Sequence, residues 1–226
     1  MKTRNVYLII ICAAIFLFMF AANKTLSQGR IDDTNVISEM KRGDKYVLNI
    51  SSDEIDSLTG GFGKLYKEAD CVLVVTPTLH RINSANAIFT FADIDKAIKD
   101  CKYINKKQVL VCEPCNFNNR KSYISTNGYN IMQQDKKYVL FLKKVKSVNS
   151  QDFRGYTVFT PVSPVFGKFC AESEDVTADT IKNVDLNNSK IMYSDIADWD
   201  ILTSDMDVLE EYKDIKKLVY MNLLDT

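Results

Sequence analysis

Histidine is nearly absent from this sequence, which has 226 residues and a single histidine, His80. A chain with one histidine cannot build a metal centre that uses several histidine ligands. Most serine or cysteine hydrolases also depend on a histidine placed beside the nucleophile. The sequence therefore argues against a His-rich metal site and against most hydrolases of this kind. We expect a surface or capping role for His80.

A second pair of metal-binding cysteines is also missing. Cys112 and Cys115 form one C-x-x-C motif, whereas Cys71, Cys101 and Cys170 stand alone. A structural zinc site needs four ligands, usually from two such pairs. We therefore predict neither a metal site nor a cofactor.

The eight glycines include no phosphate-binding loop. Gly60-Gly61-Phe62-Gly63 precedes Lys64, but a P-loop has a longer glycine spacing, a Ser or Thr after the lysine, and a strand before it. Carboxylate pairs such as Asp93/Asp95 fit solvent-facing positions and do not indicate a glycosidase. No motif of this chain indicates an enzyme class strongly.

The longest apolar stretch runs from Val6 to Ala22 and carries no charge. As a helix it covers about 25 Å, near the lower limit for crossing a bilayer. Lys2 and Arg4 precede it, which holds the amino end in the cytoplasm. We predict a membrane segment within residues 1–22, whose embedded side chains include Val6, Leu8, Ile10, Ile15, Phe18 and Phe20.

The end of this segment is a poor cleavage site for signal peptidase. Such sites need small residues at positions −3 and −1, and cutting after Ala22 or Ala21 puts Phe20 or Met19 at −3. We therefore expect an uncleaved signal anchor and a single-pass protein of the cell membrane, with its C-terminal domain outside the cytoplasm. If the segment is cleaved, the domain is secreted.

Charge is balanced overall, at 29 basic and 29 acidic residues, but it is unevenly distributed. Residues 101–170 carry 12 basic and 3 acidic side chains, a net +9, whereas residues 171–226 carry 5 and 14, a net −9. Either the acidic tail lies across the basic segment and neutralises it, or the basic segment binds an anionic partner such as anionic lipid or cell-wall polymer. Export argues against nucleic acid as a partner.

The polar residues that follow the membrane segment show no sustained periodicity, so we predict a stalk over residues 23–50. Residues 51–226 then form the extracytoplasmic domain. Five segments in it are rich in β-branched and aromatic residues, as strands are. They are Cys71–Thr78, Ala87–Ile98, Gln108–Cys112, Lys137–Lys143 and Tyr156–Val162. The same composition allows the fifth strand to continue to Phe169.

The predicted fold class is mainly β with flanking helices (α+β), built on a five-stranded antiparallel barrel. In the second strand, Ile88, Thr90, Ala92 and Ile94 alternate with Phe89, Phe91 and Asp93. A capping box at residues 51–54 predicts a helix that the glycines at 60–63 interrupt. A C-terminal amphipathic helix, capped by Ser204, has one apolar face, made of Val208, Leu209, Tyr212, Ile215, Val219 and Leu223.

The order of these elements resembles a known group of proteins. The resemblance lies in Ala69-Asp70 entering a strand, the strand Phe89–Ile98, the stretch Asp135–Leu142, and the run from Tyr156 to Phe169. It is similar to uncharacterised, membrane-anchored surface proteins of low-GC Gram-positive bacteria, whose exported domain is an OB-type barrel related to netrin and tissue-inhibitor modules. The resemblance implies no known activity.

Cys112-Glu-Pro-Cys115 is the sharpest local motif. A C-x-x-C pair acts as a redox dithiol when its first cysteine lies at a helix N-terminus, but residues 116–119 do not indicate a helix. A structural disulfide or two buried thiols fit as well. Our main hypothesis is a membrane-tethered binding or scaffold protein without catalytic activity, whose partner is a protein or an anionic envelope component. The alternative is a thiol-disulfide protein that uses Cys112 and Cys115.

Overall fold

The computed structural model describes residues 33–51, 61–84, 86–100, 102–104, 106–118, 120–146, 153, 155–182 and 191–225. The helices are α2 (Asp33–Lys41), α3 (Gly61–Glu68), α5 (Tyr193–Ile196) and α6 (Met206–Val219), with a 3₁₀ turn η1 (Gly43–Lys45) and a π-helical turn η3 (Tyr220–Leu224). The strands are β1 (Val47–Ser51), β2 (Cys71–Asn83), β3 (Ile88–Lys99), β4 (Gln108–Glu113), β5 (Cys115–Phe117), β6 (Ser122–Thr126), β7 (Tyr138–Lys144), β8 (Val158–Pro161) and β9 (Lys168–Cys170).

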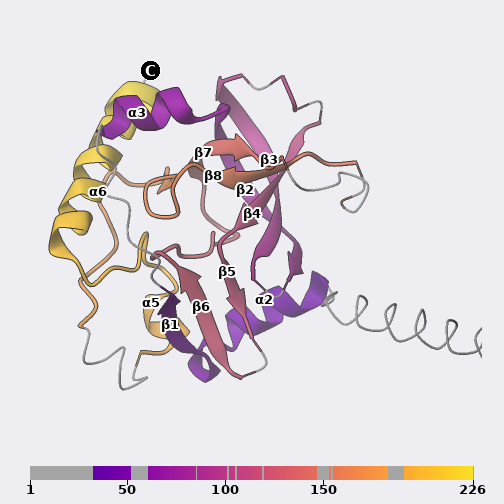
Figure 1. Ribbon diagram of the computed structural model, residues 1–226, viewed down its shortest axis with the longest axis vertical. Coiled ribbons are helices and arrows are strands. Elements are labelled where there is room, and N and C mark those ends of the chain that lie inside the picture. The colour runs from indigo at the N-terminus through magenta and orange to yellow at the C-terminus, as the bar shows by residue number, and fades with distance from the viewer. Residues whose placement is uncertain are drawn as a thin grey trace, which may run out of the picture.

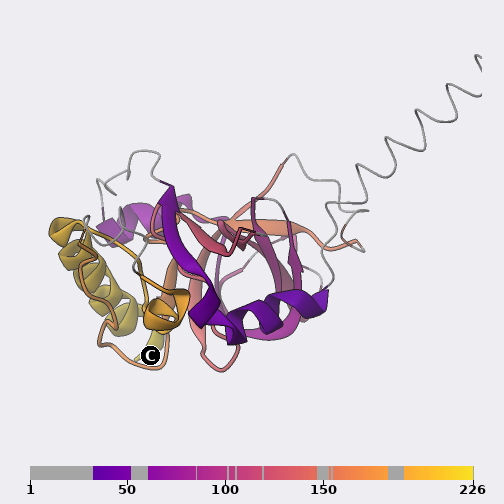
Figure 2. The same ribbon diagram turned by 90° about the horizontal axis from the view of Figure 1, so that it is seen from below.

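Five strands close into a barrel in the order β2-β3-β4-β8-β7, and β7 pairs back with β2 (Figure 1). Figure 2 shows the same strands from below, curving around one another. The prediction of a mainly β fold with a five-stranded barrel and flanking helices is confirmed. The prediction that all neighbouring strands are antiparallel is wrong for one pair. β4 and β8 run parallel, with Leu110 opposite Val158. A closed ring with an odd number of strands cannot alternate in direction throughout, so one parallel pair is unavoidable.

The alternation predicted for the second strand is confirmed in β3. Ala92, and Ile94 beside it, pack in the cluster that fills the barrel, with Leu73, Val111 and residues of β7. Phe89 and Phe91 belong to a separate cluster on the outside of the barrel. Successive strand residues point to opposite faces, so β3 presents aromatic rings outward.

The fifth predicted strand is two strands. β8 pairs with the C-terminal half of β7, and β9 pairs with its N-terminal half on the same edge. The loop between them folds tightly, and a Cβ on Gly167 would lie 2.5 Å from the Ser163 carbonyl oxygen and 2.6 Å from Pro161 Cβ. Only glycine fits this position without a backbone shift.

Residues 33–50, predicted as part of a stalk, instead form α2, η1 and most of β1 and belong to the folded domain. β1 pairs in parallel with β6, and with β5 these strands make a second sheet. Val36 of α2 and Leu48 of β1 are buried in the core beside that sheet. The two elements are too short to show a sustained periodicity in the sequence, which is why their packing was missed.

The C-terminal helix is confirmed, and its predicted apolar face packs on the outside of β2 and β7. Its N-cap is Asp205 rather than Ser204, because the Asp205 carboxylate accepts a hydrogen bond from the Asp207 N–H at 2.9 Å. α3 starts at Gly61 and includes Gly63, and the helix that these glycines were predicted to interrupt falls on residues 52–60, outside the described residues. The capping box lies almost wholly outside the described residues.

The predicted membrane segment, with its embedded residues from Val6 to Phe20, lies outside the described residues. Within the described ranges, no helix is both long and apolar enough to cross a bilayer.

Two leucines of α6 give a matched test of this packing. Leu209 is 3% exposed against the barrel, whereas Leu218 is 40% exposed on the same helix. We expect Leu209→Ala to lower the free energy of unfolding by about 2–5 kcal/mol, because it leaves a cavity. Leu218→Ala should change it by about 0.5 kcal/mol or less. Urea unfolding of the full chain measures both, and equal losses would contradict the observed orientation of α6.

Candidate binding face at the barrel end

The two cysteines of the C-x-x-C motif point into different parts of the molecule. Cys112 lies on β4 and packs in the outer aromatic cluster, whereas Cys115 lies on β5 and is buried in the core beside the second sheet. Both are free. In an extended chain, a spacing of three residues places side chains on opposite faces. The motif would bring its sulfur atoms together on a helix, but here it separates them.

Burial also keeps both thiols protonated. Desolvation, followed by the nearby Glu113 carboxylate, raises the pKa of Cys112 to about 11. The same two causes raise the pKa of Cys115 well above its usual value. Because the thiolate is the reactive form, neither sulfur is activated as a nucleophile at neutral pH.

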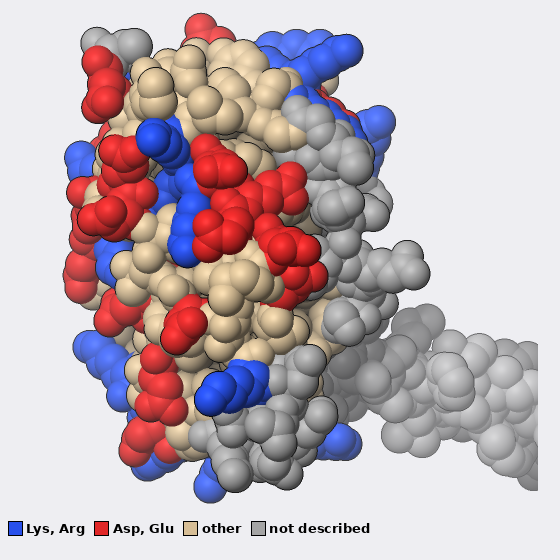
Figure 3. Space-filling view, turned by 90° about the vertical axis from the view of Figure 1, so that its left-hand side faces the viewer, with Lys and Arg blue, Asp and Glu red and all other residues tan. Residues whose placement is uncertain are grey.

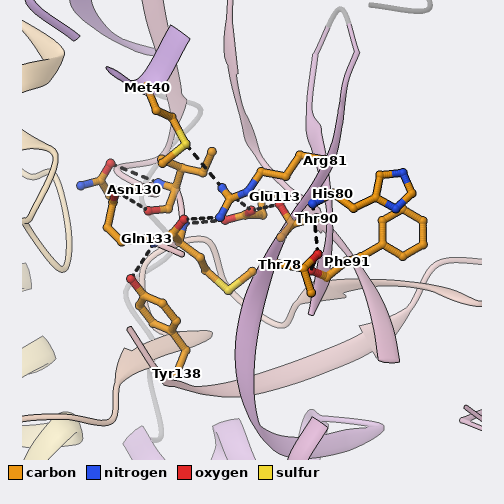
Figure 4. Close-up of polar contacts among 12 residues, drawn as sticks. Met40, Thr78, His80, Arg81, Thr90, Phe91, Glu113, Asn130, Gln133 and Tyr138 are labelled. Carbon is orange, nitrogen blue, oxygen red and sulfur yellow. Dashed lines mark hydrogen bonds and ion pairs between the residues drawn. The ribbon is translucent and has the colours of Figure 1, made fainter. Parts of the chain in front are cut away.

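Between these cysteines lies Glu113, half of a buried ion pair that the sequence analysis missed (Figure 4). Its side chain and that of Arg81 are fully buried, with Arg81 Nη1 3.8 Å from Glu113 Oε1. Glu113 accepts hydrogen bonds from the Tyr129 hydroxyl and the Met132 N–H, both at 2.8 Å, and from Thr90. Arg81 donates to the Met132 carbonyl at 2.7 Å. These bonds make the pair a structural centre with no opening to a ligand.

Lys168 is a second buried charge, 3% exposed. Its Nζ lies 5.1 Å from the ring centroids of both Tyr129 and Tyr138, and burial lowers its pKa. Its Nζ donates a hydrogen bond to the Asp200 carbonyl oxygen at 3.5 Å. The Asp200 carboxylate itself pairs with Lys216 at 3.2 Å. These groups join the barrel to the C-terminal region.

The acidic tail packs on part of the basic segment, but it does so mainly through the apolar face of α6. Figure 3 shows the face that carries α6, where acidic side chains outnumber basic ones. Among the described residues, one ion pair joins a basic side chain of residues 101–170 to an acidic side chain of residues 171–226, between Lys136 and Asp198 at 3.2 Å. Pairing of opposite side-chain charges between the two segments is therefore sparse in the described part of the chain.

Lysine and tyrosine side chains gather at the end of the barrel where β3 connects to β4. The Nζ atoms of Lys102 and Lys144 lie 5.2 and 4.3 Å from the centroid of the Tyr103 ring. Lys106 Nζ lies 3.5 Å from the centroid of the Tyr156 ring. Ring faces attract cations, so two tyrosines hold three positive charges at one end of the barrel. We call these five residues the basic end.

Hydrogen bonds fix the basic end to the barrel. The Thr157 hydroxyl donates to the Tyr103 carbonyl at 3.4 Å, and the Tyr156 hydroxyl donates to Gln108 Oε1 at 3.3 Å. The Gln108 amide in turn donates to Asp93 at 2.9 Å. These contacts join the β3–β4 connection to the start of β8.

Two hollows lie on either side of this connection, and both are lined by Ile104 and Lys106. The larger has a volume of about 280 Å³, is open to solvent, and is also lined by Lys107 and Asp100. The smaller, beside Tyr103 and Tyr156, has a volume of about 10 Å³, which is room for one water molecule. The basic end is thus grooved rather than flat.

Aromatic rings continue from the basic end across the outside of the barrel. The Tyr156 ring meets the Phe91 ring edge-on, with centroids 5.0 Å apart. The Phe91 ring is stacked with that of His80, at 4.1 Å and an interplanar angle of 2° (Figure 4). Beside them lies Phe89, which is half-buried like His80 and Tyr156. We call His80, Phe89, Phe91 and Tyr156 the aromatic strip.

The comparisons with known proteins assign no family. No family model, curated protein or solved structure matches this chain. Among the described residues, no three histidine, cysteine or acidic side chains are grouped so as to hold a metal ion.

The buried ion pair is tested by two Glu→Gln variants. Glu113→Gln leaves the buried Arg81 without its carboxylate partner, so we expect it to lower the free energy of unfolding by about 3 kcal/mol or more. Glu68→Gln removes an exposed pair with Lys143 and should cause no measurable change. Denaturant unfolding compares them, and similar small losses would show that the buried pair is not a structural centre.

Alkylation of the thiols tests their ionisation. With its pKa raised to about 11, Cys112 should react with iodoacetamide slowly at pH 7, and its rate should rise about tenfold per pH unit up to the pKa. Cys115 should react only when the protein unfolds. Peptide mass spectrometry after timed labelling separates the two sites. A Cys112 rate that levels off below pH 8 would restore the dithiol hypothesis.

Proposed function

We propose that this protein is a membrane-anchored binding protein without catalytic activity, whose folded domain lies outside the cytoplasm. Its partner is an anionic component of the cell envelope, held at the basic end of the barrel. The anchor is the apolar segment from Val6 to Ala22, and Lys2 and Arg4 before it support the proposed orientation.

The observation that carries this proposal is the grouping of Lys102, Lys106 and Lys144 on two tyrosine rings. Among the described residues, the ammonium groups of Lys102 and Lys144 form no ion pair with a carboxylate. Like charges held close together repel unless an anion lies between them. An anion with several charges would neutralise this group, and at Lys102 and Lys144 it would displace no carboxylate of the described residues.

The strand order supports the proposal of an OB-type barrel, the fold that the resemblance implies. Counted along the barrel, the order β2-β3-β4-β8-β7 is 1-2-3-5-4, with the third and fifth strands parallel. This is the Greek-key arrangement of OB-type barrels. The thiol-disulfide alternative is not favoured, because Cys112 and Cys115 lie in separate clusters and their side chains do not meet.

Two charge-matched variants test the basic end. The first changes Lys102, Lys106 and Lys144 to Gln, and the control changes three exposed lysines on α3 and α6, Lys64, Lys67 and Lys217. The full chain, carried in nanodiscs of neutral lipid, is passed over immobilised polyglutamate and over vesicles that contain phosphatidylglycerol.

We expect the first variant to bind its anionic probe about tenfold more weakly than the unchanged protein, the loss of roughly three partly exposed ion pairs. The control should bind as the unchanged protein does. The difference should shrink as salt rises, because salt screens exposed charges. Equal weakening in both variants, or none in either, would contradict the proposed location.

A further inference from the structure

The aromatic strip lies on a part of the barrel that no described helix covers. The outer surfaces of β2 and β7 pack against α3 and α6 in a large apolar core. Around Phe91, by contrast, the described members of the outer cluster come from β2, β3, β4 and β8 and from the segment between β7 and β8. Phe91 is buried at 3% exposure beneath its neighbours, and Phe153 of that segment packs on Phe89 with ring centroids 4.7 Å apart, so the described part of the chain covers these rings with other side chains and not with a helix.

This strip and the basic end are one continuous surface, because Tyr156 belongs to both. The centroid of the Tyr156 ring lies 5.0 Å from the centroid of the Phe91 ring and 3.5 Å from Lys106 Nζ. Beyond Phe91 the strip ends in the stacked His80 ring. A ligand that extends along this surface therefore meets flat rings at one end and positive charges at the other.

Building on the proposed function, we infer that the ligand is an anionic polysaccharide. Sugar rings carry flat faces of C–H groups that pack on aromatic rings, and their carboxylate or phosphate groups pair with lysines. The half-buried rings of His80 and Phe89 lie on β2 and β3, and that of Tyr156 lies just before β8, so each keeps part of its side chain accessible for stacking. A lipid surface would need protruding apolar side chains, and a simple polyanion would need only the lysines.

Two polymers with one carboxylate per unit separate sugar binding from charge alone. Polygalacturonate carries its carboxylates on sugar rings, whereas polyglutamate carries them on a peptide chain. We expect the full chain in neutral nanodiscs to bind polygalacturonate about tenfold more tightly than polyglutamate. This difference is the contribution of one or two stacking contacts. Phosphatidylglycerol vesicles and a single-stranded thymidine oligonucleotide serve as competitors.

Leucine variants identify the rings responsible. His80→Leu and Phe89→Leu each keep an apolar side chain but remove a planar ring, so at least one should fold, as a thermal unfolding midpoint will show. Each folded variant should lose the preference for polygalacturonate and keep its binding to polyglutamate. Tyr66→Leu is the matched control, because Tyr66 is half-buried on α3 with Lys99 over its ring at 5.3 Å.

The other outcomes are distinct. Equal binding of both polymers, unchanged by the leucine variants but lost when Lys102, Lys106 and Lys144 become Gln, would overturn the polysaccharide inference and leave the proposed function standing. Tighter binding of vesicles or of the oligonucleotide than of polygalacturonate would also overturn it. Failure to bind any of these anions would overturn the proposed function itself.

Discussion

The buried ion pair between Arg81 and Glu113 is the interaction on which the rest of the structure depends. Arg81 belongs to β2 and Glu113 to β4, and the two side chains meet where the barrel adjoins the second sheet. Through Tyr129 and Met132 the pair also holds the chain that leads into β7. Removing two charges from water costs several kcal/mol each, so such a pair persists only where hydrogen bonds surround it.

Barrel closure then determines which surfaces remain available. α3 and α6 cover the outer surface of β2 and β7, while the outer surface around β3, β4 and β8 carries aromatic side chains and no described helix. Closure with five strands requires a parallel pair, and here that pair is β4 and β8. That pairing brings Tyr156, just before β8, beside the connection from β3 to β4. The basic end and the aromatic strip both depend on this juxtaposition.

Two residues show why the candidate site was only partly predictable. The excess of lysine in residues 101–170 was visible in the sequence, and it includes Lys102 and Lys144. Their convergence on the Tyr103 ring was not visible, because they come from chain segments that only barrel closure brings together. Cys112 and Cys115 show the reverse case, in which a visible motif suggested a site that the fold does not form. A C-x-x-C motif brings its two thiols together on a helix, but on an extended chain it places them on opposite faces.

Several features of the fold were determined by the sequence alone: the alternating faces of β3, the apolar face of α6 and the strand-forming segments of the barrel. Each depends on a local period of two or 3.6 residues, which the chain displays without reference to distant residues. Tertiary structure decided the parallel pair, the packing of residues 33–50, the partner of Arg81 and the meeting of Tyr156 with Lys106. These depend on strand register and closure, and contacts between distant residues leave no periodic trace in the sequence.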